Sequence, residues 1–356
     1  MIKICSYVAF TNYYSALPCA AANAEFYRRK KMIIFTFIQK SIIQGIGILF
    51  GSIGEIVTEK SGNLNLGVPG MMYMGGVAGL MGAFFYESAV AVPNPFVGML
   101  ISLLCALLCS AFGALIYSFL TISLRANQNV VGLALTTFGI GFGNFFGGSI
   151  SKIAGAVGQI SVATTAKAYQ ACIPGLSKIP VLGQILFSYG FLTYLAIILA
   201  FATSFLLLKT RVGLNLRSIG ENPGAADAAG INIEKYKYIA TIAGGAVAGL
   251  GGLYFVMEYL GGTWTNNGFG DRGWLALSLV IFSMWDCRKA ILGSFLFGAL
   301  YILYMYIPGL SRGVQELLKM SQYLVTIIVL VIASMKNKKE NQGPEKLGVP
   351  YFREER

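Results

Sequence analysis

The sequence predicts an all-α integral membrane protein, a polytopic bundle of about eight to ten transmembrane helices. Hydrophobic residues make up 56% of the 356 residues, charged residues only 12%, and the mean hydropathy is +0.67. A soluble domain carries about 25% charged residues, so this chain has too few to cover an ordinary water-exposed surface. Its 44 Gly residues are typical of membrane helices that pack closely. The sequence contains no His, which excludes His-based triads, metal sites and proton relays.

Apolar stretches bounded by charged, Pro or polar residues predict the individual spans. They cover residues 33–57, 66–86, 96–122, 128–146, 184–208, 236–259, 273–286, 289–306 and 317–335. Three G-x-x-x-G pairs lie on these stretches, and such pairs let helix backbones approach one another. They are Gly75/Gly79, Gly143/Gly147 and Gly245/Gly249. We therefore expect a transmembrane domain over 32–335 that packs as a bundle of several helices.

The distribution of Lys and Arg predicts the orientation of the bundle. The loop 209–235 and the tail 336–356 are both basic, and four predicted spans separate them. The two segments therefore lie on one side, which the positive-inside rule identifies as cytoplasmic. This assignment makes 336–356 a basic cytoplasmic tail and places the long segment 147–183 outside. Arg272, which directly precedes the stretch 273–286, is also expected outside.

The N-terminal extension 1–31 conflicts with this orientation, because its basic cluster 28–31 would lie outside. Three interpretations are open. Translation begins at Met32, an extra helix over 4–24 brings the cluster inside, or the extension is a weak signal peptide.

The ionisable residues argue against coupling to an ion gradient. The carboxylates Glu55, Glu258 and Asp286 fall near predicted span ends, where we expect interface water to reach them. A proton-coupled carrier normally needs an acidic residue in the middle of a span, and none is predicted there. The chain also has no G-x-x-x-x-G-K-[ST] motif, so it does not hydrolyse ATP by that route. We predict neither a catalytic nor a metal-binding residue.

The segment 60–70 is unusual at the start of a span. Asn63 and Asn65 enter an apolar stretch among several Gly and Pro residues, a combination that breaks a helix. Two interpretations have equal weight. The segment is either a discontinuous element that reaches into the bundle or a plain cytoplasmic turn.

The loop 213–231 predicts a short helix of about two turns. Asn222 suits the N-cap, Pro223 the first helical position and Gly230 the C-terminal stop. The intervening residues are mostly Ala, which favours helix. A helix this short is marginal alone, so something must pack against it. Two interpretations are open: the helix packs in a cleft of a partner protein, or it packs on the chain's own bundle.

Four segments resemble the permease subunits of ABC importers for nucleosides and simple sugars, relatives of the branched-chain amino-acid permeases. They are SGNLNLGVPGMMYMGG at 61–76, the block 213–240, GWLALSLVIF at 273–282 and the tail LGVPYFREER at 347–356, which resembles the nucleoside branch. The resemblance covers 32–356. The chain departs from it at Pro69, where Glu is more frequent, and at Asp286 and Cys287, where a Pro commonly follows the Trp.

The resemblance implies that the loop holds a cytoplasmic coupling helix that docks on an ATPase subunit. The residues implied in this coupling are Arg217, Glu221, Asn222, Pro223, Ala225, Ala226, Asp227, Ala229 and Gly230. It further implies a second permease, expected as a heterodimer partner, and an extracytoplasmic substrate-binding lipoprotein. ATP and Mg would be bound by the ATPase subunit, and this chain would bind no cofactor and no nucleic acid. We expect Ala226→Arg to leave the protein in the membrane but to uncouple it.

The substrate path is predicted from side chains that suit a flat base and a hydroxylated ribose. The candidates are Asn63, Asn65, Asn144 and Trp274, with Trp264 and Asn266 as further options. Both Trp residues also suit an interfacial aromatic belt, which is the favoured interpretation. The leading hypothesis is a nucleoside ABC permease of the bacterial cytoplasmic membrane. A simple-sugar permease is the main alternative, ahead of an ion-coupled secondary transporter and a membrane enzyme such as a lipid transferase.

Overall fold

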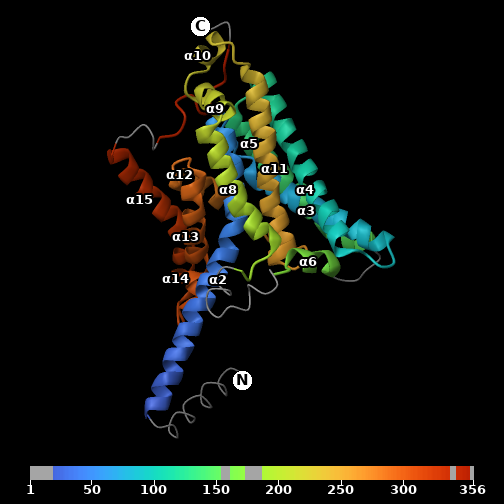
Figure 1. Ribbon diagram of the computed structural model, residues 1–356, viewed down its shortest axis with the longest axis vertical. Helices are drawn as coiled ribbons and strands as arrows, with labels where there is room; N and C mark the ends of the chain where they lie inside the picture. The colour runs from blue at the N-terminus through green and yellow to red at the C-terminus, as the bar shows by residue number, and fades with distance from the viewer. Residues whose placement is uncertain (1–18, 154–160, 173–186, 337–341, 353–356) are drawn as a thin grey trace.

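The computed structural model describes residues 19–153, 161–172, 187–336 and 342–352 (Figure 1). The regular structure of this part is helical, apart from a single bridge between Ser161 and Thr263. The helices are α2 (Cys19–Lys60), α3 (Val68–Ala89), α4 (Pro95–Ser118), α5 (Gln128–Ile153), α6 (Ala163–Tyr169), α8 (Phe191–Lys209), α9 (Arg211–Glu221), α10 (Pro223–Ala228), α11 (Ile233–Tyr254), α12 (Arg272–Phe282), α13 (Cys287–Tyr306), α14 (Arg312–Lys319) and α15 (Ser321–Lys336). Two π-helical turns, η1 (Phe119–Ser123) and η3 (Phe255–Tyr259), extend α4 and α11.

Seven helices in the described residues are long and apolar enough to cross a membrane. An eighth crossing is formed if α14 and the first part of α15, which meet at a bend of 40°, count as one broken span. The predicted all-α polytopic bundle is therefore confirmed.

The stretch 273–286 was expected to span, and this expectation is wrong. It forms only α12, whose 11 residues rise about 16 Å, roughly half the hydrocarbon thickness. The helix ends at Phe282 because the chain turns sharply, with Met284 and Trp285 in left-handed backbone conformations (φ 54° and 57°). α12 is thus a half-helix that starts inside the bundle.

The centre of the bundle is formed by α2, α3 and α11, which pack through glycine. A Cβ on Gly75 of α3 would lie 2.5 Å from the Gly249 carbonyl oxygen of α11. A Cβ on Gly54 of α2 would lie 2.1 Å from the Gly244 carbonyl oxygen. Both distances are below any ordinary contact, so only Gly allows these backbones to approach. The close packing expected from the G-x-x-x-G pairs on α3 and α11 is confirmed.

The outer helices present long apolar side chains to the surroundings. On α4 the exposed residues Leu104, Leu108 and Phe112 repeat at helical spacing, and Phe201 and Phe205 do so on α8. Water would not favour such continuous apolar faces, whereas lipid tails contact them without cost. These faces place the bundle in the hydrocarbon region.

Helix α2 is longer than a membrane span. Its 42 residues extend about 63 Å and run without a break through the basic cluster 28–31 into the first span. Residues 24–33 are therefore helical and do not form the turn that an antiparallel extra helix over 4–24 would need. Residues 1–18, on which the three N-terminal interpretations also depend, lie outside the described part.

Candidate functional site

The predicted short helix is present at one end of the bundle as α10 (Figure 1). Asn222 caps it, with its Oδ1 accepting a hydrogen bond from the Ala225 N–H at 3.0 Å. Pro223 occupies the first helical position, and Gly230 follows the helix with a φ of +79°, which favours Gly. The local capping chemistry therefore behaves as predicted. The amphipathic helix α9, which leads into α10, was not foreseen.

Helix α10 has one face on its own bundle and one face free. Pro223 and Ala226 are buried, and Ala226 packs with Ile219 and Ile233. The opposite face is exposed to the surroundings. Its residues, including those at the two ends of the helix, are Asn222, Ala225, Ala228, Ala229 and Gly230, and Glu221 at the end of α9 is also exposed. The inner face therefore folds back on the chain's own bundle, and docking of the exposed outer face on a partner stays a prediction.

This geometry corrects the role expected for Ala226. Its side chain is 3% exposed, so it faces the chain's own core and not a partner. An Arg at this position would disrupt the loop before it blocked docking. Ala228, which the sequence reasoning left out, is exposed beside Ala225. The spacing of Pro223 and Ala226, three residues apart, is the signal that distinguishes the inner face.

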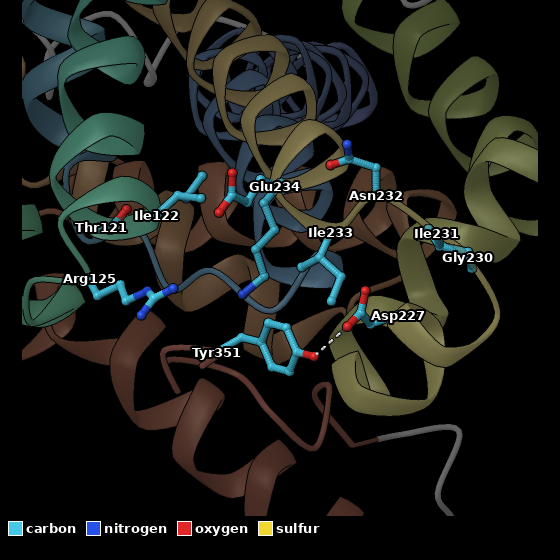
Figure 2. A pocket seen from close by; sticks show the side chains of 11 residues that line it. Thr121, Ile122, Arg125, Asp227, Gly230, Ile231, Asn232, Ile233, Glu234 and Tyr351 are labelled. Carbon is cyan, nitrogen blue, oxygen red and sulfur yellow. Dashed lines mark hydrogen bonds between the residues drawn. The ribbon is translucent and has the colours of Figure 1, made fainter. Parts of the chain in front are cut away.

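A cavity of about 420 Å³ lies beside α10 (Figure 2). It is bordered by η1 and the turn after it, the coupling loop, the start of α11 and the C-terminal segment. At its edge the Tyr351 hydroxyl donates a hydrogen bond to Asp227 Oδ2 at 3.0 Å. Lys237, which is 5% exposed, also lines the cavity. The Asp227 carboxylate, expected to contact an ATPase, is therefore engaged within the chain.

A second cavity, of about 470 Å³, is bordered by α8, α9 and the turn between α12 and α13. Arg217 and Glu221 line it together with Lys60 and Asp286. Arg217 is half-buried, and its Nε has no acceptor among the described residues. The charged residues expected to flank the coupling helix thus lie on α9, one turn apart along a charged cavity.

The segment 61–67 between α2 and α3 is buried in the bundle. Side chains from neighbouring helices bind its main-chain groups, since a buried non-helical backbone must be satisfied. Gln128 Oε1 accepts from Leu64 N–H at 2.7 Å, and the Tyr117 hydroxyl donates to the Leu64 carbonyl at 2.6 Å. The segment is therefore a buried connection between two candidate spans and not a turn exposed to water, and its interpretation as a discontinuous element stays a prediction.

The two Asn side chains of this segment hold its shape. Asn63 Nδ2 donates to Thr241 Oγ1 at 3.0 Å, and Asn65 Oδ1 accepts from the Gly67 N–H at 2.9 Å. Both residues are at most 1% exposed. In this conformation they line neither of the two cavities described above. Their assignment to the substrate path remains a prediction.

Glu55 is buried directly beneath the same segment. Its Oε1 accepts from the Asn65 N–H at 2.9 Å, while Oε2 has no partner among the described residues. The side chain is 1% exposed, so the expectation that interface water reaches it is wrong. Its neighbour Glu59 accepts a hydrogen bond from Trp285 Nε1. The two carboxylates join α2 to the broken segment and to the end of α12.

The chain enters the bundle a second time through the non-helical segment 260–271. Asn144 of α5 holds it by two hydrogen bonds: Nδ2 donates to Asn267 Oδ1 at 2.7 Å, and Oδ1 accepts from Asn267 N–H at 3.0 Å. Asn267 has a φ of +55°, a conformation that Asn tolerates better than most residues. Asn266 and Asn267 are exposed and Asn144 is half-buried, so polar amides meet the surroundings here.

Aromatic rings support this segment from within. Trp264 is buried, packs on Gly147 of α5 and donates its indole N–H to Asn266 Oδ1 at 2.9 Å. The rings of Tyr73 and Phe269 lie 4.4 Å apart. Trp264 is therefore a core residue and not a belt residue at the interface. Trp274, in the first turn of α12, is half-buried.

Arg272 is buried inside the bundle, and its expected position outside is wrong. It is 7% exposed and follows the segment 260–271 into the interior. Its guanidinium donates to the Phe269 carbonyl at 3.0 Å and to Gln44 Oε1 at 3.1 Å. The group also lies over three aromatic rings, at 4.5 to 5.3 Å from their centroids. The rings belong to Phe255, Tyr259 and Tyr301. Aromatic faces and carbonyls thus replace the water that a loop would offer.

The described part of the chain is thus a membrane bundle with two non-helical segments between its helices and a short helix, α10, at one end. The chain belongs to the family described as "Branched-chain amino acid transport system / permease component", which it matches over residues 37–333. It is accordingly a multi-pass protein of the bacterial inner membrane and a transport component.

Curated relatives cover most of the chain. It is 31% identical to the guanosine ABC transporter permease protein NupQ of Bacillus subtilis, over 91% of this chain and 98% of the relative. It is 31% identical to the nucleoside ABC transporter permease protein NupC of Lactococcus lactis, over 83% and 91% of the two chains. It is 30% identical to the putative glucose ABC transporter permease protein TsgC13 of Haloferax volcanii, over 75% and 76%. No solved structure matches the chain.

Proposed function

We propose that this chain is the membrane-spanning permease subunit of an ABC importer that carries nucleosides into the cell. The observation that carries the proposal is the match along nearly the whole chain to two relatives that are named as guanosine and nucleoside permeases. The free outer face of α10 supports it, because a permease without its own ATPase motif needs a surface on which an ATPase can dock. That end of the bundle is then the cytoplasmic end.

The energy for transport comes from ATPase subunits that bind ATP and Mg. The small side chains Ala225, Ala228 and Ala229 give the outer face of α10 a smooth surface that fits a cleft. When the ATPases close on ATP, the docked helices move with them and the bundle changes its access. A second permease, forming a heterodimer, and an extracytoplasmic binding lipoprotein complete the importer.

The substrate passes along the face where α5 meets the segment 260–271. Asn144, Asn266 and Asn267 present amides there that can donate to and accept from ribose hydroxyls and base edges. Exposed amides are costly against lipid tails, so this face suits a polar path or a second subunit better than the bilayer. The buried Asn63 and Asn65 act on this path only after the segment 61–67 moves.

Uptake of labelled guanosine tests the substrate class. Cells that lack this chain are compared with cells that carry it, and unlabelled guanosine, uridine and glucose are added as competitors. We expect uptake to require the chain and to be suppressed by nucleosides but not by glucose. Glucose is the second candidate, because one relative is named as a putative glucose permease. Guanosine uptake that does not depend on the chain, together with uptake of labelled glucose that does, would overturn the nucleoside assignment and leave the permease assignment standing.

A further inference from the structure

The C-terminal segment 342–352 lies across the connecting elements at the coupling-loop end of the bundle. Its main chain bonds to two of them. Lys346 N–H donates to the Gly220 carbonyl at 3.0 Å, at the end of α9. Gly348 N–H donates to the Gly62 carbonyl at 3.1 Å, in the turn after α2. The segment therefore joins the coupling loop to the broken segment 61–67 by main-chain bonds that do not depend on side-chain identity.

Side chains attach the same segment to the remaining connections. The Tyr351 hydroxyl bonds to Asp227 of α10, as Figure 2 shows. The guanidinium of Arg125, in the turn after η1, lies 4.7 Å from the centroid of the Phe352 ring. The segment thus contacts the chain after α2, after η1 and within the coupling loop.

At Gly220 and Gly62 the backbones of these elements are in contact. A Cβ on Gly220 would lie 2.5 Å from the Lys60 carbonyl oxygen and 3.1 Å from Pro344 Cβ. A Cβ on Gly62 would lie 3.4 Å from Gly220 Cα and 3.5 Å from the Lys346 carbonyl oxygen. The backbones at Gly220 and Gly62 are packed together, and both are bonded to the C-terminal segment, so they cannot slide freely past one another. A displacement of α9 and α10 therefore moves the turn at Gly62.

That turn leads directly into the broken segment. Asn63, one residue beyond Gly62, bonds to Thr241 of α11, and Asn65 bonds to Glu55 of α2. These elements, α2 and α11, belong to the packed centre of the bundle. A continuous series of contacts therefore runs from Asp227 through the C-terminal segment to the buried segment 61–67.

We propose that the C-terminal segment 342–352 is a coupling strap, and that Tyr351 is a positioning residue that holds α10 through Asp227. The strap transmits the movement of the docked α10 to the segment 61–67. The inference rests on the proposed function for the identity of the cargo and of the docking partner. The C-terminal segment, predicted from the sequence only as part of a basic cytoplasmic tail, thereby has a role in coupling.

The test uses the assembled transporter and a variant that removes one hydroxyl. Tyr351→Phe deletes the bond to Asp227 and keeps the ring. Tyr86→Phe is the matched control, because Tyr86 accepts one hydrogen bond from Asn94 N–H at the opposite end of the bundle. Hydrogen exchange of the α10 amides is measured in both variants, together with the number of ATP molecules hydrolysed per nucleoside imported.

We expect Tyr351→Phe to speed exchange of the α10 amides by about tenfold and to raise the ATP cost per nucleoside, with the melting temperature unchanged. Asp227→Asn keeps an oxygen acceptor for the Tyr351 hydroxyl and should exchange as wild type, and Asp227→Ala should be impaired at least as much as Tyr351→Phe. The double variant Tyr351→Phe/Asp227→Ala should be no worse than Asp227→Ala alone. Removal of the chain from Gln342 onward should give the largest loss of coupling.

Unchanged exchange and unchanged ATP cost in Tyr351→Phe and in the truncated chain would overturn the strap and leave the proposed function intact. The exchange measurement needs no substrate, so it tests the strap even if guanosine is not the cargo. Additive effects of Tyr351→Phe and Asp227→Ala would also contradict the proposal, because the two residues would then act separately.

Discussion

Ala225 and Ala226 are neighbours in α10 but face opposite surroundings. Ala226 is 3% exposed and packs with Ile219 and Ile233, whereas Ala225 is exposed on the outer face. Adjacent residues on a helix point about 100° apart, so a helix of this length can rest on its own bundle and still offer a docking surface. Substitutions at the two positions therefore test the stability of the loop and its binding to a partner separately.

We predict that Ala225→Arg leaves the permease folded but prevents its ATPase from binding. The new side chain projects from the smooth outer face and occupies the space that a partner cleft needs. Co-purification of the ATPase with a tagged permease measures the effect, and a loss of tenfold or more is expected. Full recovery of the ATPase with Ala225→Arg would contradict the assignment of this face.

Ala226→Arg is expected to fail for a different reason. It places an unpaired charge against Ile219 and Ile233, which destabilises the loop by about 2 kcal/mol or more. The thermal midpoint of the purified permease should fall, in contrast to that of Ala225→Arg. Equal midpoints for the two variants would show that the inner face is not packed as described.

Gly75→Ala is expected to weaken the central helix packing. A Cβ there would lie 2.5 Å from the Gly249 carbonyl oxygen, and forced repacking of this kind costs about 1–3 kcal/mol. Gly141→Ala is the control, since a Cβ on Gly141 meets nothing within 4 Å. Thermal midpoints by detergent size-exclusion chromatography measure both variants. We expect the thermal midpoint to fall for Gly75→Ala but not for Gly141→Ala. A similar fall for both variants would count against the close packing of α3 on α11.

Arg272→Met should destabilise the segment 260–271. The variant removes the guanidinium bond to the Phe269 carbonyl, which keeps its donor in the main-chain N–H of residue 272, and leaves Gln44 Oε1 without its donor, at about 1.5–3 kcal/mol for each bond to a charged group. Arg312→Met, at an exposed position on α14, should have no effect. Limited proteolysis and the thermal midpoint report the difference. An Arg272→Met protein as stable as wild type would indicate that the packing of Trp264, Tyr73 and Phe269 holds the segment without the guanidinium.

Asn144→Leu is expected to lower nucleoside uptake by at least tenfold while the ATPase still binds. It removes both hydrogen bonds to Asn267 and one amide from the proposed path. Phe145→Leu, at an exposed neighbouring position, is the control and should transport normally. If Asn144→Leu transports as wild type, the path does not follow this face.

The coupling loop shows what local sequence can predict. Asn222, Pro223 and Gly230 determine where α10 begins and ends through chemistry that acts within a few residues, and this part was predicted correctly. The orientation of the helix was not predicted, because it depends on contacts with Ile233 and Tyr351, which lie farther along the chain. The resemblance identified the loop but carried no information on which of its residues are buried.

Arg272 shows where sequence reasoning failed. The positive-inside rule assumes that each basic residue outside a span belongs to a loop in water. Because Arg272 directly precedes an apolar stretch, the rule assigned it to such a loop. Its burial depends on three rings, on η3 and α13, and on the carbonyls of a broken segment. No periodicity in the sequence reports such an arrangement. The short length of α12 was missed for the same reason, since an apolar run does not reveal where a turn interrupts it.

The most direct test of the account is the energy source of guanosine uptake. Uptake is measured in cells carrying the wild-type chain or Ala225→Arg, under ATP depletion and, separately, under a protonophore with ATP maintained. We predict that wild-type uptake is lost with ATP, survives the protonophore, and is absent in Ala225→Arg under both conditions. Uptake that disappears with the protonophore and persists without ATP would contradict the account, because transport would then not depend on an ATPase docked at α10.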